Sequence, residues 1–426
     1  MRSVFFMKIL CVLFVVTGAP VLGEDPQEEV LELLRSMQKQ TTLFDLDKDP
    51  VPARETEEFQ VLRARKGHLS ELHSIVKDLT IEEDLRVCAL DVLGAIGDRR
   101  SVYLVLLILA DDNDALAVRT KAVGVAEQLG DRRAILVLTK ILRKKDRMES
   151  IEQDGQVLHR FNRWAELKRV AAEALIRWGP DERVIGVLVR YLEEETETVS
   201  TLRYAAYCLG RLGAREAIEP LLQLLSGKIP PDVRSEVYWA LGRLKSEEAL
   251  PSLMEGVDHP VESVAIASIQ GLGHLGELAV SSVPTLIRHL RDPKKPLMSR
   301  SSVADALVRI APGDVRVVRT LVEGLGMWVP EEDDLQRRRV IHVSTMVALQ
   351  FVRHPKVIPA LIRRLDSEDA EVVQASAILL HRLTGESLGK DATRWMGFWK
   401  KHSGSFSFDD KPPFRKSEDS SKQFGE

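Results

Sequence analysis

Residues 86–109 read RVCALDVLGAIGDRRSVYLVLLIL, and the same pattern of apolar, small and charged residues returns along most of the chain. It reads RTKAVGVAEQLGDRRAILVLTKIL from Arg119, RYAAYCLGRLGAREAIEPLLQLL from Arg203 and RSEVYWALGRLKSEEALPSLMEGV from Arg234. The residue that closes the first half of each copy, usually glycine, recurs at intervals of 31 to 34 residues. Self-similarity at such a period is typical of proteins that stack one structural unit on the next.

Each copy has the pattern of a helical hairpin. Apolar residues recur at steps of three and four, as on one face of an α-helix. Glycine follows the first helix, where it accepts a left-handed backbone, and proline enters the first turn of several second helices. These prolines are Pro220, Pro251, Pro284 and Pro359. Because one hairpin cannot bury both of its faces, the sequence predicts an all-α, right-handed α-solenoid of about nine hairpins, an armadillo-type superhelix.

The repeat resembles the HEAT-like repeats of the phycobilin-lyase type. Their string, V-R-x-x-A-x-x-A-L-G-x-x-G-D-x-x-A-x-x-x-L, is matched by Arg86, Ala89, Leu93, Gly94, Gly97 and Asp98. Later copies match it with substitutions, such as Lys245 in place of the second glycine. The resemblance covers about residues 55 to 403. It implies the fold and not an activity, because solenoids serve many functions.

The first 23 residues have the layout of a secretory signal peptide. Arg2 and Lys8 precede an apolar run from Ile9 to Val16, and small residues lead to a cleavage site near Gly23. We therefore expect an exported protein, either periplasmic or secreted. An uncleaved membrane anchor is the alternative, although the run is shorter than the roughly 20 residues that span a bilayer. Residues 24–58 are expected to form an N-terminal helix and a linker.

The charge of the chain argues against nucleic acid as a partner. The formal net charge is −4 at pH 7, and loss of the signal peptide would make it more negative. Nucleic-acid binding depends on neutralising phosphates, which this charge does not favour. The chain also contains no H-E-x-x-H, C-x-x-C, G-x-S-x-G or Walker sequence. The residues therefore specify no catalytic centre, cofactor or metal site.

Two insertions interrupt the repeat region, residues 59–385: one near 143–162 and one near 326–339. Insertions in solenoids map to one face and often serve binding, although such a loop can simply cover a ridge. Apolar residues from Val157 to Ala165 continue the stripe of the following helix, so this helix is expected to begin inside the first insertion. The candidate partner contacts are Arg143, Lys144, Lys145, Arg147, Trp164 and Trp328.

A ladder of cations runs through the repeats, in each case eleven residues before the residue that ends the first helix. It consists of Arg86, Arg119, Lys168, Arg234 and Arg300. Such a ladder is either structural, with carboxylates bridging neighbouring hairpins, or an anion-binding stripe. Asp84 and Asp232 lie two residues before their arginines and favour the structural interpretation.

The repeat array ends in a segment, residues 386–403, that resembles the ending of exported bacterial HEAT-repeat proteins. It carries an L-T-G-x-x-x-G-x-D-x-x-x-W-x-x-x-W pattern that begins at Leu383. Trp395 and Trp399 are four residues apart and share one helix face. We expect a cap helix whose aromatic face covers the last hairpin; a stacking platform for a sugar or a partner is the alternative. Residues 404–426 are polar and are expected to be a disordered tail.

These features favour an exported, non-catalytic scaffold that binds a protein or peptide partner along the solenoid surface. One alternative is an enzyme, or an enzyme subunit, with a groove site that no motif reveals. Another is a membrane-tethered assembly factor that retains the apolar N-terminus.

Overall fold

The computed structural model describes residues 26–42, 55–64, 68–153, 156–194, 198–327, 339–352 and 354–408. The chain divides into two compact units, residues 1–179 and residues 180–426. The predicted signal peptide lies outside the described residues, as do Trp328 and most of the linker and of the second insertion. None of the described helices is both long and apolar enough to cross a membrane.

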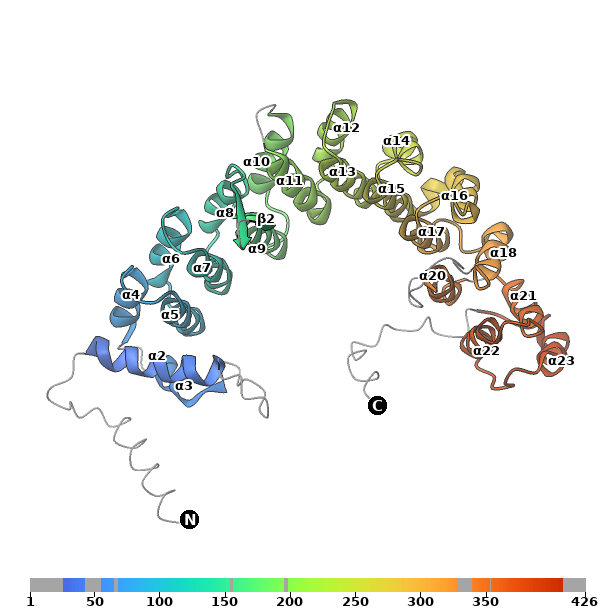
Figure 1. Ribbon diagram of the computed structural model, residues 1–426, viewed down its shortest axis with the longest axis horizontal. Coiled ribbons are helices and arrows are strands. Elements are labelled where there is room, and N and C mark those ends of the chain that lie inside the picture. Colours follow the sequence, from blue (N-terminus) through green and yellow to red (C-terminus); the bar gives the residue numbers. More distant parts are fainter. Residues whose placement is uncertain are drawn as a thin grey trace, which may run out of the picture. The chain divides into compact units, whose positions relative to one another are not determined.

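The first unit consists of two layers of helices that alternate along the chain. Its elements are α2 (Pro26–Thr42), α3 (Glu57–Ala64), α4 (Leu69–Lys77), α5 (Glu83–Ile96), α6 (Ser101–Ala110), α7 (Leu116–Leu129), α8 (Ala134–Leu142), β1 (Met148–Gln153), β2 (Gln156–Asn162) and α9 (Ala165–Arg177). α5, α7 and α9 pack side by side in one layer, and α4, α6 and α8 form the other (Figure 1). α2 and α3 pack against α5 and so cover the start of the first layer.

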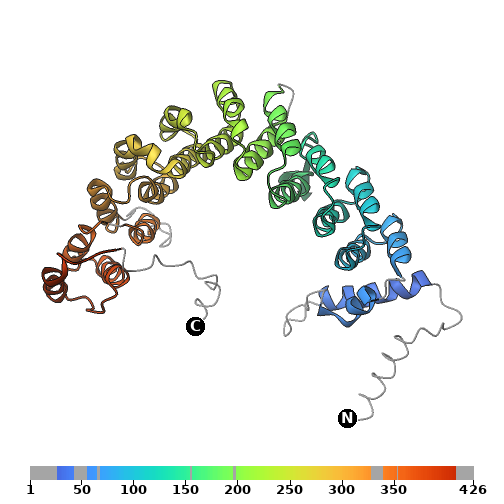
Figure 2. The same cartoon turned by 180° about the vertical axis from the view of Figure 1, so that it is seen from behind.

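The second unit continues the same alternation. Its α-helices are α10 (Glu182–Glu193), α11 (Val199–Leu212), α12 (Ile218–Ser226), α13 (Pro231–Arg243), α14 (Leu250–Gly256), α15 (Glu262–Leu275), α16 (Val283–Arg291), α17 (Leu297–Ile310), α18 (Val315–Gly324), α20 (Val340–Leu349), α21 (Val357–Arg364), α22 (Ala370–Thr384) and α23 (Ala392–His402). Short 3₁₀ turns lead into α12, α14 and α16. α11, α13, α15, α17, α20 and α22 form one layer, and the second helices of the pairs lie along one side of it (Figure 1 and Figure 2).

The helix ends follow the local chemistry that the repeat predicts. Gly97, Gly130 and Gly213 close first helices with φ between 65° and 71°, where glycine has no steric cost. Lys245 occupies the equivalent place at φ 58° and is the non-glycine exception among the described residues. In the described residues of each unit, first and second helices alternate in this way, which confirms the predicted all-α solenoid.

The first insertion contradicts the predicted early start of α9. β1 and β2 form an antiparallel hairpin with Met148 opposite Asn162, and α9 begins only at Ala165. The apolar residues between 157 and 165 fit a strand as well as a helix, because a short apolar run does not define its period. The Asp-Gly sequence between the strands favours a two-residue turn, and this turn favours a β-hairpin over an early start of α9.

Candidate functional site

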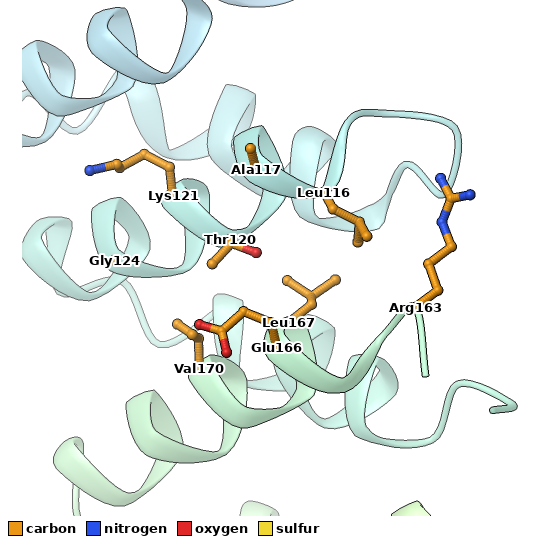
Figure 3. Close-up of a pocket in the computed structure, with 9 residues that line it drawn as sticks. All are labelled: Leu116, Ala117, Thr120, Lys121, Gly124, Arg163, Glu166, Leu167 and Val170. Carbon is orange, nitrogen blue, oxygen red and sulfur yellow. The ribbon is translucent and has the colours of Figure 1, made fainter. Parts of the chain in front are cut away.

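A groove lies between α7 and α9 in the first unit and has a volume of about 460 Å³. Its floor is apolar, and its ends carry charged side chains. The lining residues are Leu116, Ala117, Thr120, Lys121, Gly124, Arg163, Glu166, Leu167 and Val170. In Figure 3 the side chains of the two helices face each other across the groove, with Lys121 toward one end and Arg163 at the other.

The groove exists because α7 and α9 do not close onto each other. A Cβ atom built on Gly124 of α7 would meet nothing within 4 Å. On the neighbouring seam, a Cβ on Gly94 of α5 would lie 2.1 Å from the side-chain oxygen of Gln128 on α7. The hairpin lies in the connection between α8 and α9, so this is the seam at which the regular repeat is interrupted. We attribute the wider spacing of α7 and α9 to this insertion.

The hairpin is anchored to the helices by a tryptophan surrounded by cations. Trp164 lies at the start of α9 and is only 9% exposed. The Arg119 guanidinium carbon lies 5.4 Å from the ring centroid, the Lys144 ammonium 5.2 Å and the Arg163 guanidinium carbon 5.5 Å. The negative face of an indole ring attracts cations, most strongly where water is excluded. Trp164 therefore joins α7, the end of α8 and the base of the hairpin.

Two aspartates pair with cations in and beside this cluster. Asp112 accepts hydrogen bonds from Lys144 and pairs with Arg119 at 3.2 Å. Burial opposes ionisation of Asp112, but the hydrogen bond and charge of Lys144 and the charge of Arg119 together lower its pKa. Asp146 accepts from the ammonium of Lys168 at 3.1 Å and from the side-chain amide of Asn162 at 2.5 Å. These pairs fix the cluster in place and offset part of its positive charge.

The predicted partner contacts of the first insertion separate into two groups. Trp164, a candidate partner contact, is only 9% exposed, and cations cover its ring, so the ring offers a partner little surface. Lys144 is committed to Asp112 within the same cluster. Arg143 and Lys145 are exposed, and Arg147 is 64% exposed beside Glu149 at 3.4 Å.

The cation ladder points into the protein. Arg86 is 3% exposed, donates to the Val76 carbonyl at 2.9 Å and forms a two-pronged ion pair with Asp114 at 2.7 and 2.8 Å. Arg119 donates to the Leu109 carbonyl at 2.8 Å, and Arg300 to the Leu290 carbonyl at 2.9 Å.

The other two cations of the ladder, Lys168 and Arg234, make weaker or different versions of these contacts. Lys168 is buried and donates to the Lys144 carbonyl at 2.5 Å, whereas Arg234 is half-buried and reaches the Gly227 carbonyl at 3.4 Å. Each cation of the ladder donates to a backbone carbonyl at or just beyond the end of the preceding second helix. The unpaired carbonyls and the helix dipole favour a positive charge at that end. These contacts give the ladder a structural role.

The carboxylates that bridge the ladder are not those the sequence singled out. Asp84 accepts instead from the side-chain amide of Gln38 at 3.3 Å. The partners Asp112 and Asp114 come from the loop before α7, which packs beside the ladder only in the folded chain. His342 was also missed: its Nδ1 lies 2.6 Å from the Leu325 carbonyl and fills the ladder's place in α20.

The C-terminal cap buries one of its two tryptophans. Trp395 is 0% exposed and donates from Nε1 to the Gly389 carbonyl at 2.8 Å, so its ring is not available as a platform. Trp399 packs against Phe406 with ring centroids 5.4 Å apart, and Phe406 packs against Phe408 at 5.0 Å. The predicted disordered tail is therefore wrong for residues 404–408, because these phenylalanines extend the aromatic cluster. Residues beyond 408 lie outside the described part of the chain.

The groove residues were not singled out from the sequence. Gly124 is the informative one, since a glycine inside a helix weakens it and calls for a packing or binding reason. Within the described ranges, no three His, Cys, Asp or Glu side chains gather closely enough to hold a metal ion.

Comparison with known proteins supports the repeat fold. The HEAT repeats family matches residues 194–273. No curated protein sequence matches the chain. Importin beta superposes with a TM-score of 0.54 at 11% identity, over 88% of this chain and 57% of the importin. Kap95p, described as binding RanGDP, superposes with a TM-score of 0.51 at 12% identity, over 84% of this chain and 50% of Kap95p.

The chain thus spans about half the length of these two proteins. The CpcE–CpcF complex of phycocyanin lyase from Nostoc sp. PCC7120 is 21% identical over 55% of this chain and 89% of that one, with a TM-score of 0.32. A similarity at this TM-score carries no structural argument. At such identities the two larger similarities show the fold alone.

Proposed function

We propose that this chain, a HEAT-like repeat protein, is a scaffold that binds a segment of a partner protein in the groove between α7 and α9. One observation carries the proposal: the groove has an uncovered apolar floor in a layer of helices that elsewhere packs closely. An apolar floor loses contact with water when a partner's apolar side chains fill it, which favours association.

An amphipathic helix is the segment that this groove fits best. Two parallel walls, α7 and α9, leave a channel that an apolar stripe with three- and four-residue spacing can fill. Lys121, paired with Asp91 at 2.7 Å, and Arg163, paired with Glu149 at 3.1 Å, mark the ends of the floor. Glu166 on the rim is 62% exposed. A partner with an apolar centre and polar ends would match this distribution.

The rigidity of the site supports binding over catalysis. The Trp164 cluster fixes the hairpin and the start of α9, so the groove needs little ordering when a partner arrives. Kap95p, which shares the fold, is described as binding RanGDP, and this is a precedent for protein binding by such a solenoid. It does not identify the partner of this chain.

We further propose that the protein acts outside the cytoplasm, periplasmic or secreted, because its first 23 residues have the signal-peptide layout. N-terminal sequencing of the protein isolated from its own cells tests this. A mature chain that begins near Glu24 is the expected result. An intact Met1 in a membrane fraction would instead favour the tethered assembly factor.

Filling the groove tests the binding proposal. In Gly124→Trp the indole would occupy the open space that a Cβ at this position faces. Gly186→Trp in α10 is the matched control, because Gly186 is also a helical glycine with open space around its Cβ. Proteins retained by each immobilised variant would be compared by quantitative mass spectrometry.

We expect the wild type and the control Gly186→Trp to retain at least one protein in equal amounts. The amount of that protein retained by Gly124→Trp should be at least tenfold lower. Circular dichroism should show the same helix content for all three. The proposal fails if every retained protein binds Gly124→Trp as well as it binds the control.

A further inference from the structure

A second surface lies in the unit 180–426, on the partly exposed face of α11, α13 and α15. Three aromatic side chains, one from each helix, form what we call the aromatic strip: Tyr207, Trp239 and His274. The rings of Tyr207 and Trp239 stack with centroids 5.8 Å apart and an interplanar angle of 28°. The ring of His274 meets Trp239 edge-on at 5.9 Å.

Close backbone packing brings these rings together. A Cβ on Gly242 of α13 would lie 2.5 Å from the Cα of Gly271 on α15, so the two helices touch without side chains between them. A Cβ on Gly210 of α11 would lie 2.8 Å from the Cα of Ala240. The strip is therefore preorganised by its own helices, and a ligand would not have to order it.

A row of exposed cations follows the strip along the ends of the same layer of helices. This basic row consists of Arg211, Arg243, Lys245 and Arg309. The Arg243 guanidinium carbon lies 5.1 Å from the centroid of the Trp239 ring, and Lys245 donates to the His274 carbonyl. Burial, and then the charges of Arg309, Arg243 and Lys245, lower the pKa of His274.

Carboxylates on these faces do not balance the row. Asp305 pairs with Arg309 at 2.7 Å and is itself 70% exposed. Glu236 lies on α13, and burial raises its pKa to about 7, so much of it is uncharged at neutral pH. The surface thus combines aromatic rings with an excess of positive charge.

We propose that the aromatic strip and the basic row bind an extended peptide segment rich in Asp and Glu, with apolar side chains packed on the rings. Carboxylates of the segment pair with Arg243 and its neighbours, and the rings supply apolar area at little entropic cost. The rings touch each other and leave no slot for a base to stack between them, and the net negative chain does not favour phosphate. This surface belongs to the second unit and does not depend on the groove between α7 and α9.

Selection from random peptides tests the proposal without assuming a natural partner. A phage library of random twelve-residue peptides would be selected on the immobilised full chain. The best peptide would then be synthesised, labelled with fluorescein, and titrated by fluorescence anisotropy against three proteins: the wild type, Arg211→Glu/Arg243→Glu and Arg288→Glu. Arg288 is an exposed arginine on α16, in the other layer of the same unit, and is the matched control.

The expected result is enrichment of Asp and Glu among the selected peptides, and at least tenfold weaker binding by Arg211→Glu/Arg243→Glu with less than twofold change for Arg288→Glu. Binding should weaken as NaCl rises, since charge pairs at an exposed surface are screened. Selected peptides that are not acidic would overturn the proposal, as would equal losses in both charge variants. Displacement of the peptide by the oligonucleotide dT12 at equal concentration would assign the surface to nucleic acid instead.

Discussion

The seam between α7 and α9 and the seam between α13 and α15 join equivalent helices of the repeat, yet they are built in different ways. Gly242 and Gly271 let the backbones of α13 and α15 touch, whereas Gly124 on α7 faces open space. The first seam is bridged at one end by Trp164 and its cations, and the second is closed by backbone contact at Gly242 and Gly271. We infer from the comparison that an insertion in one connection can convert a packing seam into a groove while the repeat itself is kept.

The two seams also differ in what holds them together. At the first seam, buried cations reach helix-end carbonyls and aspartates: Arg119 of α7 pairs with Asp112, and Lys168 of α9 pairs with Asp146. Arg86 of α5 does the same with Asp114 at the neighbouring seam between α5 and α7. Around α13, the equivalent Arg234 is half-buried and reaches one carbonyl at 3.4 Å. Buried charges require their partners, since an unpaired charge in the interior is costly. Stability should therefore depend on ion pairs in the first unit and on close packing in the second.

The largest expected effect comes from removing a carboxylate of the first unit, at the neighbouring seam between α5 and α7. Asp114→Ala leaves the guanidinium of Arg86 buried without its counterion, and we expect the free energy of unfolding to fall by about 3–5 kcal/mol. Urea denaturation followed by circular dichroism measures this. Arg234→Ala is the comparison in the second unit and should cost less than about 1 kcal/mol. Equal losses would show that the two units do not differ in this respect.

The next effect tests the close packing itself. Gly242→Ala places a Cβ against the backbone of Gly271, so the helices must separate, and we expect a loss of about 1–3 kcal/mol in the free energy of unfolding. Gly124→Ala should instead be neutral or stabilise by up to about 1 kcal/mol, because alanine favours the helix and nothing obstructs it. The same urea titrations apply. A destabilising Gly124→Ala would mean that α7 and α9 lie closer than described.

The smallest effect is a dependence on pH within the closed seams. Burial raises the pKa of Glu236 from 4.5 to about 7, so folding favours its protonated form. Stability from this group is present at low pH and falls as pH rises from about 5 to 7. Glu236→Gln cannot ionise and does not lose this stability. We therefore expect the difference in free energy of unfolding between Glu236→Gln and the wild type to grow in favour of the variant by about 1 kcal/mol from pH 5 to pH 8. The effect is this small because the carboxyl is only partly buried.

Thermal and urea unfolding at both pH values measure that difference. Burial lowers the pKa of His73 and His289, but these groups are common to both proteins and cancel. The exposed Glu247→Gln serves as the control and should show no such growth. If Glu236→Gln follows the wild type at every pH, Glu236 is solvated and the seam is looser than described.

Much of the fold could be predicted because it is local. The intervals from Gly97 to Gly213 follow from the left-handed backbone that ends each first helix, and the structure shows that backbone at both residues. The period at which apolar residues recur then gives the pairing of helices in each hairpin. Such information lies within a few residues of each helix end and needs no knowledge of the folded chain.

The candidate site could not be predicted in the same way, because it depends on spacing between helices. The sequence makes Trp164 a candidate partner contact in an insertion, but cations from α7 and from the end of α8 cover its ring. The strand pairing of residues 148–162 depends on a turn that competes with a helical interpretation of the same apolar residues. We attribute the open space beside Gly124 to the position of the hairpin between α8 and α9. No spacing of residues in the sequence predicts that space.

The central claim is that the groove between α7 and α9 holds a segment of a partner protein, and photo-crosslinking from inside the groove tests it most directly. A benzophenone amino acid would replace the exposed Ala117 in the groove or, as a control, the exposed Lys140 on α8 in the other layer, in the cells that make the protein. The account predicts a discrete crosslinked protein from position 117 that is absent from position 140 and is lost when Gly124→Trp is added. Equal crosslinking from both positions, or a position-117 product that survives Gly124→Trp, would contradict it.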